Sequence, residues 1–427
     1  MHILILCIFI LGYIAIAFEH SIKINKTATA LLTGVLCWTV YIVMGENKLF
    51  ISAQLTEHLG ELSGILFFLM GAMTIVELID AHGGFDIITS RITTTDKRKL
   101  LWIICIITFF LSSVLDNLTT AIVMVSLLRK LIDDKENRLL FIGMVIIAAN
   151  AGGAWSPIGD VTTTMLWIGG QITPLKIMIK LLIPSLLCLI VPLIIVSFKL
   201  KGNICKPVLA VDKIGLSLSK GERNIIFFTG IGGLIFVPVF KTITHLPPFM
   251  GVLFALGILW VITEIIHRQK EIEDKDALSV VQALRKIDVP SILFFLGILI
   301  AIAALQSTGQ LASLAQLMNE KIGNLNIIVP AIGLLSAIID NVPLIAASMG
   351  MYDINMYPAD SYIWHFLAYC AGTGGSILII GSAAGVAAMG MEKINFIWYL
   401  KKIAWLAAIG YFAGALWYVV QEYLFFS

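Results

Sequence analysis

Long apolar stretches recur along most of this 427-residue chain, and many reach the roughly 20 residues that a helix needs to cross a bilayer. Within hydrocarbon, only helices and closed barrels can satisfy all of their own backbone hydrogen bonds. Hydrophobic residues make up 59% of the chain and charged residues 13%, whereas soluble domains average about 45–50% and about 25%. We therefore expect an all-α polytopic membrane protein whose first partner is the lipid bilayer, with no nucleic-acid partner.

The cysteines and the first apolar run add two exclusions. The six cysteines are scattered singly without CxxC or Cys/His spacing, so neither a disulfide framework nor a metal site is indicated. The run at 3–18 could be a signal peptide, but it lacks a basic segment before it. We interpret it as a membrane helix, and we expect no cofactor.

A polar Asp-Asn pair interrupts the apolar sequence twice. Asp116 and Asn117 lie between apolar runs at 100–111 and 121–128, and the same pair returns at Asp340 and Asn341. The copies are 224 positions apart, close to half of the chain. A charged group at membrane depth is costly and usually marks a functional site.

The placement of basic residues predicts the topology. We expect ten spanning helices near 3–18, 27–44, 63–81, 139–168, 177–198, 224–240, 249–266, 289–306, 363–390 and 397–421. With this map, 24 of the 29 Lys and Arg residues, Lys26 among them, fall in one set of loops. Cytoplasmic loops collect basic residues, so both termini are expected outside.

The same charges indicate that each Asp-Asn element is a re-entrant hairpin. Basic residues flank the Asp116 element at 97–99 and 129–130, which predicts that both of its ends are cytoplasmic. The Asp340 element has only Lys321 beside it, so both of its ends are expected outside, and Pro343 suits a hairpin tip. The alternative, two full spans, would invert later loops and spoil the charge asymmetry.

The two halves match beyond these pairs. After each hairpin comes a helix interrupted by glycines, at Gly152-Gly153 and at Gly374-Gly375. Each half has an odd number of crossings, so the copies should be inverted relative to each other. The expected units are a first repeat at 1–200, a cytoplasmic basic linker at 201–223 and a second repeat at 224–427. Inverted repeats with broken helices are typical of secondary transporters.

Four blocks, at 115–125, 149–164, 340–344 and 372–385, carry a resemblance to the NhaD-type sodium/proton antiporters of the wider ion-transporter superfamily. The resemblance implies a scaffold part that forms a homodimer, a transport part of hairpins and broken helices, and exchange of Na⁺ and Li⁺ for H⁺ in a bacterial inner membrane. The best-known members of the superfamily are sodium-coupled carboxylate symporters with Ser-Asn-Thr at their hairpin tips. Here Asp precedes Asn in both copies, which disfavours an anionic substrate, and Pro343 falls where the Thr would lie, so the superfamily's coordination cannot be transferred to the second tip.

The tips and breaks are rich in oxygen ligands, which hard cations such as Na⁺ prefer. The candidate ion-binding and proton-carrying residues are Asp116, Asn117, Asp340, Asn341, Ser112, Ser113, Thr119, Thr120, Ser336, Asn150, Gly152, Gly153, Thr373, Gly374, Gly375 and Asp160. We expect two pseudo-symmetric clusters, each made by one tip and one break. Because burial disfavours a bare charge, each tip carboxylate should hold either a proton or a cation, and this competition predicts antiport.

Some residues have two interpretations. Asp160 is either a third ion group or a residue of an aqueous cavity, and its counterpart in the second repeat is Ser382. Glu77 and Asp80, at the inner end of a helix beside His82, could form an inner gate, a pH sensor or a solvated helix end.

Other functions remain as alternatives. A sodium-coupled anion symporter or an oxyanion exporter on the same scaffold would need cationic or neutral groups at the tips, and no Lys or Arg lies in the predicted core. An intramembrane enzyme is disfavoured because HExxH, Ser/His and GxGD-type patterns are lacking. A channel is conceivable, but inverted halves favour alternating access.

Overall fold

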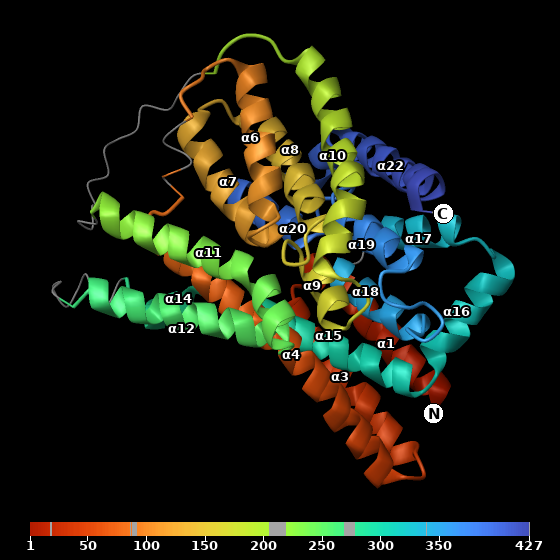
Figure 1. Ribbon diagram of the computed structural model, residues 1–427. Coiled ribbons are helices and arrows are strands. Elements are labelled where there is room, and N and C mark those ends of the chain that lie inside the picture. The colour runs from red at the N-terminus through yellow and green to blue at the C-terminus, as the bar shows by residue number, and fades with distance from the viewer. Residues whose placement is uncertain are drawn as a thin grey trace.

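The computed structural model describes the chain except for residues 18, 86, 88–91, 205–218, 269–277, 339 and 427. The described residues form helices and no strand beyond one isolated bridge (Figure 1). The helices are α1 (His2–Ala17), α2 (Glu19–Ile22), α3 (Lys26–Met44), α4 (Lys48–Ala81), α6 (Lys97–Ser112), α7 (Asn117–Leu131), α8 (Lys135–Ala154), α9 (Val161–Ile168), α10 (Pro174–Lys199), α11 (Lys220–Thr244), α12 (Pro248–Ile266), α14 (Val280–Lys286), α15 (Val289–Ser307), α16 (Gln310–Lys321), α17 (Leu325–Leu335), α18 (Asn341–Met351), α19 (Tyr362–Gly374), α20 (Ala383–Glu392), α21 (Phe396–Lys402), α22 (Ala404–Gln421) and the π-helix η1 (Glu422–Phe426). Within these ranges, eight helices are long and apolar enough to cross a membrane, which confirms an all-α polytopic membrane protein.

Several boundaries differ from the sequence-based map. The helix expected at 63–81 begins at Lys48, where the Asn47 side chain accepts from the N–H of Phe50 at 3.1 Å. Its 34 residues span about 51 Å, longer than the roughly 30 Å of hydrocarbon. The short helices α14 and α16 were not predicted, because neither has a long apolar run. The helix expected at 397–421 is divided at Ile403 into α21 and α22.

The first Asp-Asn pair lies at the turn between α6 and α7. The N–H of Asn137 lowers the pKa of Asp134 in the α7–α8 loop, and Lys97 at the start of α6 is close enough to contribute. At the end of α7, Arg129 pairs with Glu392, which also pairs with Arg138 at the start of α8. The segment therefore begins and ends in the same region, as the predicted hairpin requires, and α6 and α7 lie side by side in Figure 1.

The second Asp-Asn pair lies between α17 and α18, and both ends of this segment lie near the start of α19. At the start of α17, the Asn326 side chain accepts from the hydroxyl of Tyr362. After α18, the ring of Tyr352 packs edge-on against Tyr357 with centroids 5.4 Å apart. The carbonyl of Tyr357 accepts from the indole N–H of Trp364 at 2.8 Å. This segment is the second hairpin.

Each hairpin packs against a broken helix through a glycine. A Cβ on Gly152 of α8 would lie 2.2 Å from the carbonyl oxygen of Phe109 in α6, and one on Gly374 would lie 2.0 Å from that of Gly333 in α17. Only glycine permits such an approach. The prediction of a break at Gly152-Gly153 is wrong by a few residues, because the helical ladder continues to Ala154 and the interruption covers 155–160. The second break, after Gly374, lies where it was expected.

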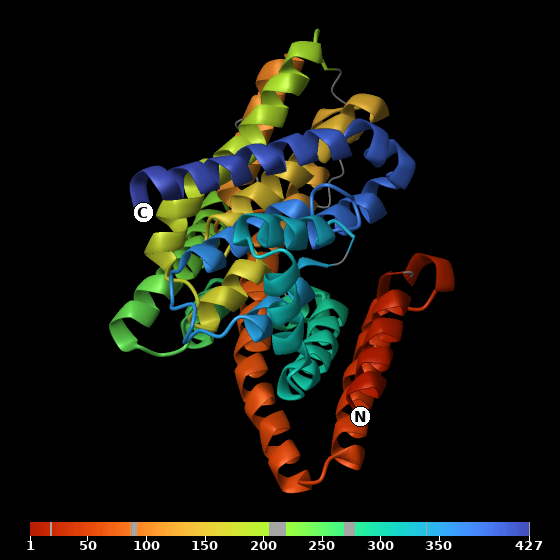
Figure 2. The same ribbon diagram turned by 90° about the vertical axis from the view of Figure 1, so that its right-hand side faces the viewer.

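The N-terminal helices pack against the second half of the chain. A Cβ on Gly34 of α3 would lie 2.6 Å from the carbonyl oxygen of Gly297, so α3 and α15 cross at close range. The indole of Trp38 donates to the carbonyl of Ile300 at 2.8 Å. In Figure 2, α1, α3 and the beginning of α4 lie at the periphery of the molecule.

Candidate functional site

Asp116 and Asn117 form the tip of the first hairpin. Asp116 caps α7, because its carboxylate accepts from the N–H of Thr119 at 2.8 Å and from the Thr119 hydroxyl at 2.6 Å. The buried amide of Asn117 donates to Oδ2 of Asp160 at 2.6 Å and to Oδ1 of Asn150 at 2.9 Å. The first tip is therefore bound to both parts of the broken helix α8–α9.

The second tip has the same residues but a weaker cap. Asp340 accepts from the N–H of Val342 at 3.3 Å. Pro343 occupies the position that Thr119 has in the first copy, so the second tip lacks both donors that Thr119 supplies. The neighbouring amide of Asn341 is buried and points toward Asp160, with its nitrogen 3.4 Å from each carboxylate oxygen.

Asp160 is the junction between the two tips. It caps α9, and its Oδ1 accepts from the N–H of Thr162 at 2.9 Å and from the Thr162 hydroxyl at 2.8 Å. Only 2% of the residue is exposed, and the amides of Asn117 and Asn341 approach it from the two hairpins. The structure thus joins residues that we expected in two separate clusters into one network around this carboxylate.

Asn150 extends the network into the second half of the chain. Its amide nitrogen donates to the hydroxyl of Ser376 at 2.8 Å and to that of Ser382 at 2.9 Å, both in the break between α19 and α20. The sequence-based candidate set omitted these two serines. The repeat could have identified Ser382, because it occupies the position that Asp160 has in the first half. Like Asp160 it caps a helix, α20, by accepting from the N–H of Gly385 at 3.2 Å.

Two of the candidate hydroxyls hold the hairpins in place. Ser112 donates to the carbonyl of Ala149 at 2.6 Å, and Ser336 donates to that of Ala371 at 2.8 Å. These are equivalent positions in the two copies. Each bond connects the end of the first hairpin arm to the adjoining broken helix, so both hydroxyls are engaged with backbone.

Three further hydroxyls have different surroundings. Ser113 donates to the carbonyl of Phe110 at 2.7 Å, and Thr373 donates to that of Tyr369 at 2.6 Å. The hydroxyl of Thr120 is buried without a hydrogen-bond partner among the described residues. It is thus a candidate oxygen that internal bonding does not occupy.

The second glycine of each pair fixes the shape of the break. A Cβ on Gly153 would lie 2.5 Å from the carbonyl oxygen of Gly159, and one on Gly375 would lie 2.7 Å from that of Gly381. The chain can fold back on itself at both breaks because these positions lack side chains.

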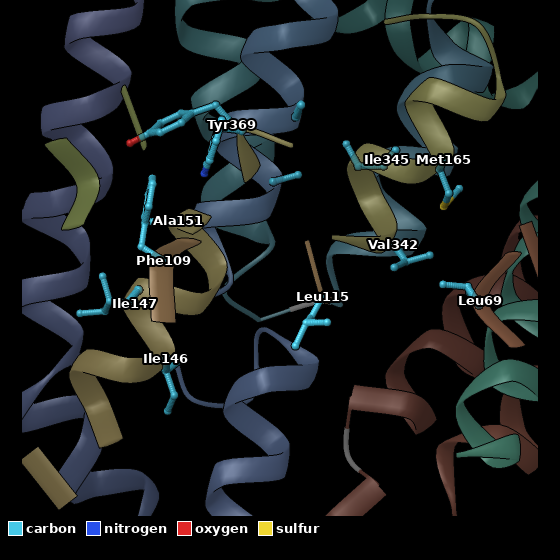
Figure 3. Packing of buried hydrophobic residues seen from close by; sticks show 14 of the residues in the cluster. Leu69, Phe109, Leu115, Ile146, Ile147, Ala151, Met165, Val342, Ile345 and Tyr369 are labelled. Carbon is cyan, nitrogen blue, oxygen red and sulfur yellow. The ribbon is translucent and has the colours of Figure 1, made fainter. Parts of the chain in front are cut away.

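A cavity with about 780 Å³ of space free of protein atoms, part of it open to solvent, lies beside the tips. Its lining includes the carboxylates of Asp116, Asp160 and Asp340, together with apolar side chains of α4. Figure 3 shows Leu115 and Val342, each next to a tip pair, among buried side chains of both halves. The arrangement places three acids around one space whose remaining lining is mostly apolar.

The cavity lining also contains Lys26, the first residue of α3. Its Nζ atom lies 3.6 Å from Oδ2 of Asp340 and 4.4 Å from the ring centre of Phe294. The expectation that no Lys or Arg reaches the core is therefore wrong. The loop assignment concerned the backbone of Lys26, whereas its long side chain extends inward to a charged partner.

The possible sensor residues lie elsewhere. Glu77 pairs with Lys286 at 3.3 Å. His82 is 1% exposed, so the expectation of a solvated helix end is wrong for this residue. Its Nε2 lies 3.2 Å from Nε2 of His267, and the two rings stack. Asp80 lies on the exposed surface of the same helix end. None of the three predicted residues is part of the described cavity lining.

Comparison with known proteins gives one family. A model of the citrate transporter family matches residues 13–372. Sodium/proton antiporter 1 of Arabidopsis thaliana is 49% identical over 98% of this chain and 72% of its own, and sodium/proton antiporter 2 is 47% identical over 96% and 98%. The Na(+)/H(+) antiporter NhaD of Vibrio cholerae is 29% identical over 93% of this chain and 87% of its own.

Proposed function

This chain belongs to the citrate transporter family and, within it, to the NhaD-type sodium/proton antiporters, and on that premise we propose that it exchanges Na⁺ for H⁺. The protein is a membrane transporter rather than an enzyme. The observation that carries the proposal is the position of Asp160, a buried carboxylate approached by the tip amides of both hairpins.

The exchange follows from the cost of a bare buried charge. A carboxylate in apolar surroundings is stable when it holds a proton or a cation, and less so when it holds neither. Asp116 and Asp340 line the same cavity as Asp160, so cation and proton compete for acids that lie close together. If the cavity can open to the other side of the membrane only when its carboxylates hold Na⁺ or H⁺, the movement of Na⁺ in one direction is coupled to the movement of H⁺ in the other.

The proposed cation ligands are side-chain oxygens around Asp160. Its carboxylate and the amide oxygens of Asn117 and Asn341 supply hard oxygen donors that Na⁺ prefers, and the unbonded hydroxyl of Thr120, in the first turn of α7, is a further candidate at the first tip. In the structure the amide nitrogens of Asn117 and Asn341 face Asp160; a rotation of either side-chain amide by about 180° would turn its oxygen toward a cation bound at the carboxylate. Li⁺ is also a hard cation and is a second proposed substrate.

The proposed mechanism is alternating access between inverted repeats. The repeats are residues 1–200 and 224–427, joined by the basic linker at 201–223, part of which lies outside the described residues. The equivalent bonds of Ser112 and Ser336 support this division, because each attaches a hairpin to the broken helix of its own half. We propose that movement of these units exposes the cavity to one side and then to the other.

Orientation, assembly and location are further proposals. The distribution of basic residues supports termini on the outside. A homodimer and a bacterial inner membrane follow from the resemblance alone; relatives occur in a plant as well as in bacteria.

A sodium-coupled symporter of organic anions is the second candidate, because the matching family model is named for citrate transport. Lys26, the one basic residue of the described lining, already pairs with Asp340. The described lining of the cavity carries three carboxylates against this one ammonium group, and such a field repels anions.

Everted vesicles with a fluorescent pH indicator test the two candidates together. In vesicles acidified by respiration, NaCl and LiCl should restore fluorescence, whereas KCl and choline chloride should not. Uptake of labelled citrate driven by a sodium gradient, without a response of the indicator, would instead favour the symporter.

A second measurement tests the shared carboxylates. With pH equal on both sides, the apparent Na⁺ constant should rise about tenfold for each unit by which the pH is lowered, over the range where protons occupy the shared site. This change corresponds to ~1.4 kcal/mol. The maximum rate at saturating Na⁺ should stay the same. A constant apparent affinity with a falling maximum rate would indicate a separate pH-controlled gate.

A further inference from the structure

Lys26 is held firmly at the edge of the cavity by the start of α3. Asn25 caps the helix by accepting from the N–H of Thr27 at 2.8 Å. The Thr27 hydroxyl donates to the carbonyl of Pro290 in α15 at 2.9 Å, and the N–H of Lys26 donates to Glu19 at 3.1 Å. The backbone beside Lys26 is therefore fixed to α15, a helix that also packs against α18.

The lysine compensates for a difference between the two hairpins. In the first, Thr119 supplies two neutral donors to Asp116. In the second, Pro343 replaces that threonine, and Asp340 has the weaker bond from Val342 and the ammonium group of Lys26. One tip acid is thus held by uncharged groups and the other by a cation that belongs to the chain.

Other charged or titratable groups face this pair from the neighbouring elements. Asp116 and Asp160 line the same cavity, from the first hairpin and from α9. Glu19 of α2 binds the Lys26 backbone, and Tyr13 of α1 lies within electrostatic range of Asp340. Asp288 caps α15 and accepts from Ser291, another residue of the cavity lining. In the described lining of the cavity, Lys26 is the one basic residue beside three carboxylates, so its ammonium group partly balances their charge.

We propose that Lys26 is a tethered counter-ion of Asp340. Its ammonium group competes with the transported cation and is displaced from the Asp340 carboxylate when that cation binds. The proposal rests on the Na⁺/H⁺ exchange proposed above and adds a positioning residue that acts through Asp340. The ammonium lies close to the position that a cation bound to Oδ2 would take, since the two atoms are 3.6 Å apart.

Two opposite effects follow from removing the charge. Na⁺ no longer competes with the ammonium, so Na⁺ binding at alkaline pH should become tighter. Protons also bind more readily to an acid that has lost a cationic neighbour, by a factor of about ten or more. A lysine that serves only the fold would produce neither change.

The test uses purified full-length protein and reconstituted vesicles. For Lys26→Met, we expect an apparent Na⁺ constant at pH 9 that is several-fold lower than in the wild type. The pH at which exchange is half-maximal should move about one unit toward alkaline pH. Lys26→Arg, which keeps the charge, should have nearly the wild-type apparent Na⁺ constant and nearly the wild-type pH of half-maximal exchange. Lys23→Met is the matched control, because this exposed lysine lies three residues earlier in the same connection.

The outcomes separate the inference from the proposed function. If the wild type exchanges Na⁺ and Lys26→Met keeps its Na⁺ constant and pH profile, the counter-ion role is wrong and the exchange stands. If the wild type shows no Na⁺-dependent exchange, the proposed function itself fails. If Lys26→Met does not accumulate, the double variant with Asp340→Asn should restore folded protein, because the unpaired carboxylate has been removed. Failure of the double variant would overturn the proposal.

Discussion

The amide nitrogen of Asn117 lies 2.6 Å from Oδ2 of Asp160, so the tip of one hairpin donates directly to the acid at the start of α9. The amide of Asn341 approaches the same acid from the other hairpin, with its nitrogen 3.4 Å away. A single carboxylate is therefore approached by both hairpins, so a movement of either hairpin changes its surroundings.

Asp160→Asn should abolish Na⁺-dependent exchange and leave the amount of folded protein nearly unchanged. Asparagine caps a helix about as well as aspartate, so the bond to Thr162 can persist while the charge is lost. The measurement is recovery of fluorescence in everted vesicles at matched protein levels. Activity equal to that of the wild type would make Asp160 a polar cavity residue without a transport role.

Asp116→Asn and Asp340→Asn should each reduce exchange to the background of vesicles without the protein. Both acids cap a helix, and an amide preserves that cap but cannot carry a proton or balance a cation. Asn117→Ala and Asn341→Ala should instead raise the apparent Na⁺ constant. Full exchange in either Asp→Asn variant would remove that acid from the mechanism.

Gly152→Ala and Gly374→Ala should destabilise the protein by about 1–3 kcal/mol or more, because the added methyl group would collide with a hairpin carbonyl. Gly232→Ala is the control, since no atom lies within 4 Å of its added Cβ, and alanine favours a helix by about 1 kcal/mol. Thermal unfolding in detergent measures the difference. Equal melting temperatures in the three variants would contradict the close packing.

Cysteines at Lys97 and Lys135 should both be labelled from the cytoplasm, and cysteines at Asn319 and Asp353 from the outside. The expectation combines the hairpin shape with the distribution of basic residues. An impermeant maleimide on whole cells and on everted vesicles distinguishes the two faces. Opposite labelling of Lys97 and Lys135 would exclude a re-entrant first hairpin.

Asp360, in the loop before α19, should contribute stability that depends on pH. Burial raises the pKa of this carboxyl, but contacts with His365 and with the N–H and hydroxyl of Thr173, at 2.7 and 2.9 Å, outweigh burial and hold the pKa well below its usual range. A depressed pKa gives stability that is complete above the ordinary aspartate pKa of about 3.9 and is lost as the pH falls toward the lower folded value.

For Asp360→Asn we therefore expect a loss of about 1.5–3 kcal/mol at pH 7. Asparagine tolerates the left-handed backbone of this residue, so the variant should not add strain. The difference in melting temperature between wild type and variant should narrow from pH 5 to pH 3. A difference that stays constant over this range would mean that the charge of Asp360 is not what stabilises the loop.

The sequence by itself determined the all-α membrane fold, and it predicted both hairpins and most residues of the candidate site. These features depend on local patterns: apolar length fixes a spanning helix, an Asp-Asn pair in apolar sequence marks a costly polar site, and glycine pairs mark a close approach. The repeat added Asp160 and its counterpart Ser382, although the sequence left the role of Asp160 open.

Only the tertiary structure decided which of these residues meet. The contact of Lys26 with Asp340 joins residues more than 300 positions apart, and Asn150 reaches Ser376 and Ser382 from the other half of the chain. Such contacts depend on how helices cross and how far a side chain extends, and neither is encoded in a local pattern. For this reason the sequence placed Lys26 in a loop, while the structure brings its charge to the site.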